Sequence, residues 1–206
     1  MPSKPTVPTI AAVEADLGLR ERKKLRTRRS IREAARRLIE EQGYEHTTIE
    51  QIAAEAEVSP STVFRYFPTK EHIVLTDEFA ASGIDLLRSR PADEPPLVAL
   101  RETLTGMVHH VYGDYGAEYR WRRELVRTVP TVRAFMYEAQ YRMVDAACAA
   151  LAERTGRPAD DLELRVVVGA MTGAFHQVLW GDHSEEGDLL DLIDRALAVL
   201  NRGLVL

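Results

Sequence analysis

Residues 48–67 read TIEQIAAEAEVSPSTVFRYF, and this stretch decides how the N-terminal part of the chain folds. Thr48 can cap a short helix, with Gln51 at the third helical position reaching back to complete a capping box. Ser59 suits the cap of a second helix, and Pro60 suits its first turn, where a missing N–H costs nothing. The turn between the two helices falls around residues 57–59. The stretch therefore predicts a helix-turn-helix.

A strong amphipathic helix precedes this motif. Its apolar stripe follows the i, i+3, i+4, i+7, i+8 spacing of one buried face, and Gly43 can end it in a left-handed conformation. The stripe consists of Ile31, Ala34, Ala35, Leu38 and Ile39. In the motif itself, a small core of Ile52, Ala53, Val58, Val63 and Phe67 is expected to fix the angle between the two helices.

The charge of the chain is distributed unevenly. Residues 20–37 contain ten Lys and Arg against two Glu, whereas residues 71–206 contain 14 Lys and Arg against 22 Asp and Glu, in a chain of net charge −5. A basic stretch ahead of an acidic body predicts one surface that binds a polyanion. The alternative is an ordinary solvated helix face.

The second helix of the motif carries short or forked donors that can reach base edges in a major groove, namely Ser61, Thr62 and Arg65. Tyr66 and Lys70 flank it and can hold phosphates, as can Thr48 with the amides that follow it. The complete set of expected DNA-binding residues is Arg28, Thr48, Ser59, Ser61, Thr62, Arg65, Tyr66 and Lys70. Ahead of them, Arg22, Lys23, Lys24 and Arg26 are expected to form an arm that extends into the adjacent minor groove.

The remainder of the chain also has helical periodicity and no strand signal. We expect one helix from Lys70 to near Arg88, and then helices over 97–112, 117–128, 131–154, 159–182 and 186–202. The predicted fold is all-α with nine helices. Its expected parts are a disordered tail (1–19), a three-helix helix-turn-helix domain (20–68) and a ligand-binding and dimerisation domain (69–206).

Other classes of protein find little support. The single cysteine, Cys148, excludes an internal disulfide, and no apolar run is long enough to span a membrane. The N-terminus lacks the pattern of a signal peptide, so a cytoplasmic location is expected. No metal site, cofactor or catalytic motif is predicted. The alternative function is an all-α enzyme or small-molecule-binding protein without operator specificity.

Three runs of sequence carry a resemblance to a known family. RRSIREAARRLIEEQGY (28–44), TTIEQIA (47–53) and VSPSTVFRYFPTKE (58–71) resemble the N-terminal domain of the TetR family of transcriptional regulators. The resemblance implies a homodimer that binds a pseudo-palindromic operator, most often as a repressor, and that a small-molecule effector releases from DNA. Pro60-Ser61 departs from the lysine and glycine that many members have at these positions.

A second resemblance concerns the body. LGLRERKKLRTRR (17–29) together with RPADEPPLVALRETL (90–104) is similar to actinobacterial members related to the mycofactocin-system regulator, which implies an acyl-CoA-type effector. Mixed apolar and aromatic residues suit such a cavity. The expected ligand-binding residues are Met107, His110, Val111, Tyr115, Trp121, Tyr137, Tyr141, Phe175 and Trp180.

The last two helices have broad apolar faces that are expected to form the dimer surface, although they could equally pack inside one chain. Because a two-fold operator needs a two-fold protein, we favour the dimer. The expected contacts are Val167, Ala170, Met171, Ala174, Leu192, Ile193, Ala196 and Leu200.

Overall fold

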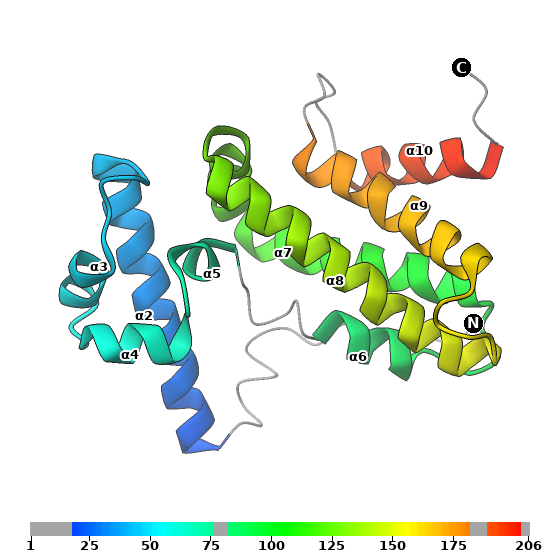
Figure 1. The fold of residues 1–206 in the computed structure, drawn as a ribbon, viewed down its shortest axis with the longest axis horizontal. Coiled ribbons are helices and arrows are strands. Elements are labelled where there is room, and N and C mark those ends of the chain that lie inside the picture. The colour runs from blue at the N-terminus through cyan, green and yellow to red at the C-terminus, as the bar shows by residue number, and fades with distance from the viewer. Residues whose placement is uncertain (1–17, 76–81, 182–188, 203–206) are drawn as a thin grey trace. The chain divides into compact units, whose positions relative to one another are not determined.

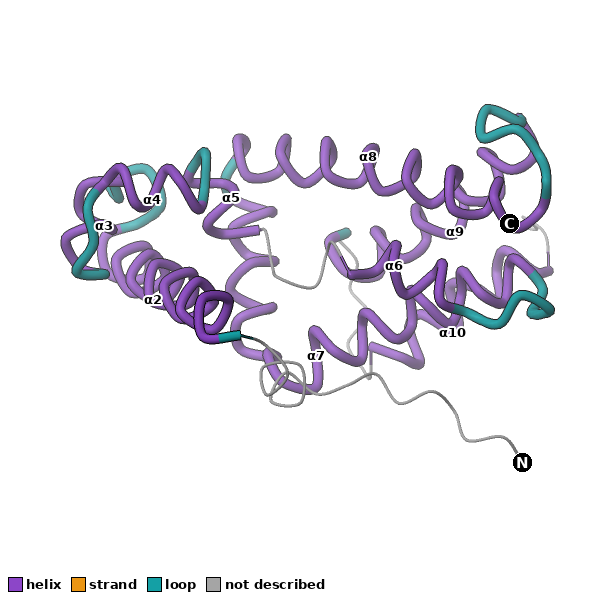
Figure 2. Tube along the Cα trace, turned by 90° about the horizontal axis from the view of Figure 1, so that it is seen from below, coloured by secondary structure: helices purple, strands orange, loops and turns teal. Residues whose placement is uncertain are grey.

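The computed structural model describes residues 18–75, 82–181 and 189–202 of the chain (Figure 1). Within these ranges the secondary structure is helical, with no strand (Figure 2), so the all-α prediction is confirmed. The chain divides into two compact units, Met1–Thr76 and Asp77–Leu206. The expected tail, residues 1–19, lies outside the described residues except for Gly18 and Leu19.

The first unit contains four helices in its described part: α2 (Leu19–Gln42), α3 (Ile49–Glu55), α4 (Pro60–Tyr66) and α5 (Lys70–Leu75). Three of them are too short to be stable alone, so their stability comes from packing. Their shared core comprises Ile31, Ala34, Ala35, Ile52, Ala53, Ala56, Val63, Phe67 and Ile73. Ile73 belongs to α5, so the first unit continues beyond the expected boundary at residue 68.

The helix ends in this unit follow the local sequence as predicted. Thr48 accepts a hydrogen bond from the Gln51 amide (3.2 Å), and the Gln51 side chain accepts one from the Thr48 amide (2.9 Å), which completes the capping box. Ser59 Oγ accepts a hydrogen bond from the Thr62 amide (3.1 Å) at the start of α4. Gly43 ends α2 as expected, but its φ of 86° and ψ of 159° differ from the left-handed helical conformation that the sequence predicts. These caps fix where the recognition helix begins.

The turn between α3 and α4 is a Schellman-type helix end. The Val58 amide donates to the Ala53 carbonyl (2.9 Å), and the Glu57 amide donates to the Ala54 carbonyl (3.1 Å). Glu57 has a φ of 55°, in the left-handed region that glycine ordinarily occupies. The hydrogen bonds of the turn therefore hold a glutamate in a conformation that is costly for it.

The second unit contains α6 (Ser82–Ser89), α7 (Pro96–Thr128), α8 (Pro130–Thr155), α9 (Leu162–Trp180) and α10 (Leu189–Arg202) in its described part. Its core includes Leu87, Leu100, Leu104, Val108, Ala147, Cys148, Leu151, Val168, Phe175, Ile193 and Leu197. The range expected to form one helix from Lys70 to near Arg88 contains α5 and α6, with residues 76–81 between them outside the described residues.

The prediction of two helices over 97–112 and 117–128 is wrong. The backbone is helical from Pro96 to Thr128, through Gly113 and Gly116. Each glycine inside a helix costs about 1 kcal/mol relative to alanine. The parts of α7 on either side of the glycines carry buried residues, such as Leu104 and Leu125, and their packing outweighs that local cost.

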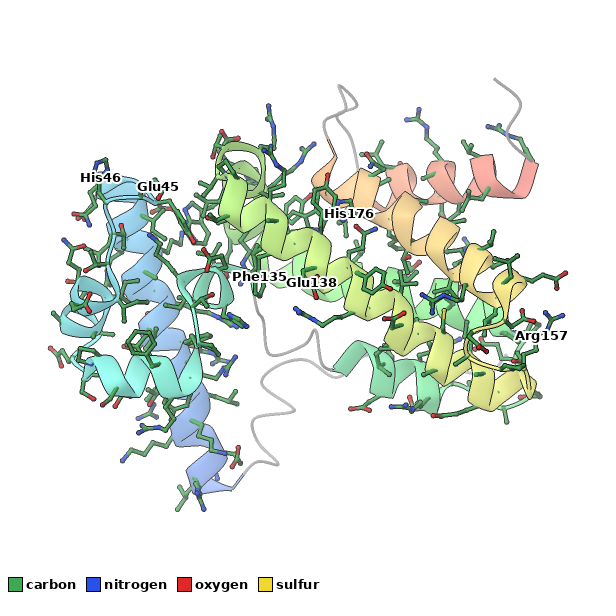
Figure 3. The ribbon with its side chains drawn as sticks, viewed as in Figure 1. Glu45, His46, Phe135, Glu138, Arg157 and His176 are labelled. Atoms are coloured by element: carbon green, nitrogen blue, oxygen red, sulfur yellow. The ribbon has the colours of Figure 1, made fainter. Side chains whose placement is uncertain are left out.

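Arginines hold the loops of the second unit in place. Arg154 on α8 donates to the carbonyls of Arg90 (2.9 Å) and Glu94 (3.2 Å), which ties the loop between α6 and α7 to α8. Arg157, labelled in Figure 3, pairs with Asp161 (3.0 Å) and Glu163 (2.9 Å) in the connection from α8 to α9. These contacts fix the ends of the helices that surround the unit's interior.

Candidate DNA-binding surface and ligand cavity

The outward face of α4 carries polar side chains and one large apolar one. Ser61 and Arg65 are exposed, and Thr62 is half-buried. The Ser59 hydroxyl lies 2.9 Å from the hydroxyls of both Ser61 and Thr62, which forms a small cluster at the start of the helix. A helix seven residues long with donors along its exposed side has the form of a recognition helix that enters a major groove.

Phe64 is a feature of this face that sequence reasoning missed. Its side chain is 51% exposed, although phenylalanine is usually buried. It lies three residues after Ser61 and next to Arg65, about 100° round α4 from Val63, which is fully buried. Helical spacing from the core residues Val63 and Phe67 places position 64 at the flank of the buried face, so periodicity alone does not predict its exposure. An exposed aromatic ring here can contact a thymine methyl group.

Arg65 lies alongside Tyr66. Its guanidinium carbon is 5.4 Å from the centre of the Tyr66 ring, within the range of a cation–π contact. This contact restricts the Arg65 side chain while leaving it exposed to solvent. Preorganisation of this kind reduces the entropy lost when the guanidinium binds a base or a phosphate.

The structure places Arg28 against the protein. Its guanidinium lies 4.6 Å from the centre of the Phe67 ring and donates to the Tyr66 carbonyl (3.4 Å). Arg32, one turn later on α2, lies 5.6 Å from the same ring. Both arginines therefore join α2 to the C-terminal end of α4. This geometry favours a positioning role for Arg28, and its direct contact with DNA stays a prediction.

Lys70 is likewise engaged within the first unit. Its ammonium donates to the carbonyls of Tyr44 (2.5 Å) and Thr47 (2.9 Å) and lies 4.0 Å from the centre of the Tyr44 ring. Burial lowers the pKa of this ammonium, and the charges of Glu45 and Glu71 partly offset the effect. Figure 3 labels Glu45 in the loop between α2 and α3. Lys70 thus connects α5 to that loop, and a phosphate contact would use what remains of its donor capacity.

The residues expected to form an extended minor-groove arm are part of a helix. Residues 19–30 are the first turns of α2, and their backbone is helical throughout. An α-helix is about 10–12 Å across, whereas the minor groove is only about 6 Å wide. Arg22, Lys23, Lys24 and Arg26 therefore cannot enter the groove as an extended strand of chain would.

The second unit contains an apolar cavity between α6, α7, α8 and α9. Its lining residues are Gly83, Ile84, Leu87, Leu100, Thr103, Leu104, Met107, Met143, Ala147 and Thr172. The cavity has a volume of about 20 Å³ for a water-sized probe. It can therefore hold a water molecule but is too small for an organic effector. The Met107 side chain packs directly on Gly83 and closes one side of the cavity. The contact is so close that a Cβ atom at position 83 would lie only 2.5 Å from the Met107 sulfur.

Among the expected ligand-binding residues whose side chains the structure describes, Met107 is the one that lines this cavity. Phe175 is buried in the core of the unit, Trp121 is half-buried, and the Trp180 ring packs at a tilt of 47° against Tyr119, with ring centres 5.3 Å apart. Tyr137 and Tyr141 are exposed on α8, and the Tyr137 ring lies 5.3 Å from the ring of His176. His110, Val111 and Tyr115 belong to α7, but their side chains lie outside the described residues.

The expected dimer residues fall on different sides of their helices. Ile193 is 1% exposed and Met171 is also buried, so both belong to the unit's own core. Val167 and Leu200 pack against that core, while Ala174, Leu192 and Ala196 are half-buried. Ala170 is exposed, and it continues an outward stripe of α9 that contains Leu162 (75% exposed) and Val166 (59% exposed). Helical periodicity cannot distinguish a core face from an interface, so the expected set mixes buried and outward residues, and its role in dimerisation stays a prediction.

The described residues contain no cluster of three His, Cys, Asp or Glu side chains that could hold a metal ion. None of their helices is long and apolar enough to cross a membrane.

A capped recognition helix on a small helical head, followed by a separate helical body, defines the class of DNA-binding helix-turn-helix proteins. Comparison with known proteins makes the assignment specific. Residues 31–76 match the family model described as bacterial regulatory proteins, tetR family, and residues 94–205 match the MftR C-terminal domain. The chain therefore belongs to the tetR family, with a body of the MftR type, which confirms both resemblances.

Individual relatives agree with this assignment. The chain is 37% identical over 151 residues to the HTH-type transcriptional regulator TcmR of Streptomyces glaucescens, covering 70% of this chain and 67% of that protein. It is 29% identical over 165 residues to the transcriptional repressor KstR of Rhodococcus jostii, covering 77% of this chain and 68% of that protein.

Solved structures share the fold. FadR of Thermus thermophilus, a repressor crystallised with lauroyl-CoA, superposes with a TM-score of 0.56 at 23% identity, covering 87% of this chain and 95% of that chain. NalD, the secondary repressor of the MexAB-OprM efflux pump in Pseudomonas aeruginosa, has a TM-score of 0.54 at 22% identity, covering 89% and 98%. The protein is thus a ligand-responsive, DNA-binding transcriptional regulator, and regulators of this family bind DNA, dimerise and bind small effectors. The enzyme alternative is not favoured.

Proposed function

We propose that the protein is a homodimeric repressor that reads a pseudo-palindromic operator with α4 of each protomer, and that an effector with an apolar, acyl-type chain releases it. The observation that carries the DNA-reading part is the outward face of α4, where Ser61, Phe64 and Arg65 are exposed beside a capped N-terminus. Arg65 can bind a guanine in the major groove through two hydrogen bonds, and each such contact contributes about 1–3 kcal/mol of discrimination.

The substitution Arg65→Ala tests this assignment. Duplexes selected from a random library by the parent protein supply the operator probe. We expect Arg65→Ala to lower the preference for that probe over a scrambled duplex by about 10- to 100-fold, while its oligomeric state stays unchanged. Arg37→Ala is the matched control, since Arg37 is an exposed arginine of the same unit that pairs with Glu55 (2.8 Å). Full discrimination retained by Arg65→Ala would contradict the assigned role of α4.

The cavity of the second unit supports the class of effector. Its lining is apolar apart from Thr103 and Thr172, and both hydroxyls donate to carbonyls of their own helices, Ala99 and Val168. Such a lining suits an alkyl chain. Two flexible methionines, Met107 and Met143, line it and can move aside to enlarge the space. The lauroyl-CoA ligand of the FadR structure is consistent with the same chemistry, and the likeness of the two chains concerns the fold alone.

Lauroyl-CoA is therefore the first probe. We expect it to bind the parent protein, raise its melting temperature and weaken operator binding, whereas coenzyme A without the acyl chain does none of these. Gly83→Val fills the cavity next to Met107 and should abolish the response to the probe while operator binding persists. Val98→Leu, an exposed position on α7, is the control. A full response in a folded Gly83→Val variant would place the effector elsewhere.

A further inference from the structure

The first turns of α2 form a basic helical rod. Between residues 19 and 30 the chain has seven Lys and Arg against one Glu, and none of these residues is fully buried. The first buried residue of α2 is Ile31, where the core of the unit begins. At about 1.5 Å per residue this part of the helix is roughly 18 Å long.

The rod has no apolar face with which to pack. Leu19 is 83% exposed, and Leu25 is only half-buried. The basic residues occur on all sides of the helix, since successive residues are separated by about 100°. Side chains that end in nitrogen accordingly fan out around this end of α2 (Figure 3). A helix that is polar on every side gains no stability from apolar packing, so contact with a charged partner would stabilise it.

The attachment of the rod sets its position relative to the recognition helix. Arg28 contacts the Phe67 ring (4.6 Å) and the Tyr66 carbonyl (3.4 Å), both at the C-terminal end of α4. Figure 1 shows the N-terminal end of α2, in dark blue, extending past α4 within the first unit. When α4 occupies a major groove about 12 Å wide, a helix that projects beyond its end reaches the phosphates that border the groove.

We propose that residues 19–30 are a phosphate-binding helix that extends the contact of each head to DNA flanking the operator. This inference rests on the proposed function. The helix is too wide for the minor groove, so it binds the phosphate backbone and adds affinity without base preference. Arg20, Lys23, Lys24 and Arg26 are the exposed side chains that carry the contact. Lys24 pairs with Glu21 (2.9 Å), but an exposed pair of this kind is weak enough to exchange for a phosphate.

The test is a variant that neutralises the rod, Arg20→Gln, Lys23→Gln, Lys24→Gln and Arg26→Gln together. Glutamine keeps the helix, because its helix propensity is similar to that of lysine and arginine. Operator affinity is measured over a range of salt concentrations, on a duplex limited to the selected site and on one with ten flanking base pairs at each end. The matched control replaces four exposed arginines of the second unit with glutamine, namely Arg88, Arg101, Arg120 and Arg142.

We expect the rod variant to lose roughly 10- to 100-fold in affinity for the longer duplex at 0.15 M salt, with a salt slope smaller by about 3 to 4 per head. On the short duplex, which lacks the flanking phosphates, the parent and the rod variant should bind with similar affinity. Both proteins should still prefer the selected sequence to a scrambled one. The control variant should resemble the parent. An unchanged slope in a folded rod variant would overturn the inference and leave the Arg65 result untouched, so the two proposals fail separately. Loss of binding to anionic lipid vesicles without any loss on DNA would also overturn it.

Discussion

The side chains that form the head have two kinds of role, and only one kind is visible in the sequence. Thr48, Gln51 and Ser59 act on backbone groups within three residues, so their caps could be predicted from the sequence and are confirmed. Arg28 and Lys70 donate hydrogen bonds to groups 23 to 38 positions away. The fold uses both side chains to hold α4 and α5, and their direct contact with DNA stays a prediction. Contacts of that range follow from packing, which residue type alone cannot determine.

The left-handed Glu57 leads to a prediction of stability. We expect Glu57→Gly to raise the free energy of unfolding by about 0.5–1 kcal/mol, because glycine relieves the cost of a positive φ at this helix end and loses part of that gain to backbone entropy. Denaturant-induced unfolding followed by circular dichroism measures the change. The control is Ala54→Gly, an exposed position within α3, which should lower stability by about 1 kcal/mol. Equal losses in both variants would mean that the turn is not strained.

His176 leads to a prediction of pH dependence. Burial lowers the pKa of this imidazole on α9 (Figure 3) below its usual 6.5. The unfolded chain therefore takes up a proton at this residue more readily than the folded chain. The buried neutral imidazole contributes fully to the free energy of unfolding above pH 6.5. That contribution is lost as the pH falls through the folded-state pKa of His176.

We expect His176→Gln to reduce the loss of unfolding free energy between pH 7.5 and pH 5. Chemical denaturation at the two pH values measures it. His46→Gln, which removes an exposed histidine of the first unit, shows how much change follows from losing any imidazole. If the parent and His176→Gln lose the same stability on acidification, His176 does not contribute.

At the scale of the elements, periodicity located the helices but not their continuity. It predicted a break in α7 at Gly113 and Gly116, where the helix in fact continues. It also predicted an arm where α2 is helical from Leu19. In both places the residues that suggested a break, glycines or a run of like charges, extend a helix that is already formed on a packed segment. Extending such a helix is favourable enough to outweigh their local cost. The cavity lining depends on four helices at once, so of the six expected ligand residues whose side chains the structure describes, Met107 alone lies in it.

The exposed stripe of α9 leads to a prediction of assembly. We expect Val166→Glu to raise the dimer dissociation constant by at least about 100-fold, because it would bury an unpaired carboxylate in the proposed interface. Light scattering coupled to size-exclusion chromatography measures the change. Val166 is 59% exposed in a single chain, so the protomer should still fold. Leu97→Glu, at a position 49% exposed on α7, is the matched control. A stable dimer of Val166→Glu would exclude this face.

At the scale of the whole molecule, the sequence predicted a head and a body, and the chain does divide into two units. The boundary lies later than expected because α5 is part of the first unit. Ile73 enters the head core, and Lys70 joins α5 to the loop between α2 and α3. The helix α5 therefore packs in the same core as the recognition helix.

Effector and operator should be thermodynamically coupled in the intact protein. If lauroyl-CoA weakens operator binding by a given factor, saturating operator must weaken lauroyl-CoA binding by the same factor, which in such proteins is typically about 5- to 150-fold. Titration calorimetry with and without the operator duplex measures it. Equal affinity of the free and DNA-bound protein for the probe would rule out release by this effector.

The protein contains one cysteine, Cys148, and it is fully buried in the second unit, where burial raises the pKa of its thiol. A thiol that is inaccessible and protonated reacts slowly with alkylating reagents. The natural chain is thus already a suitable background for site-directed spin labelling. A single cysteine introduced at Arg26 would carry one label per protomer, and pulsed dipolar spectroscopy across the dimer would report the separation of the two heads, with and without an effector, with no second thiol to remove.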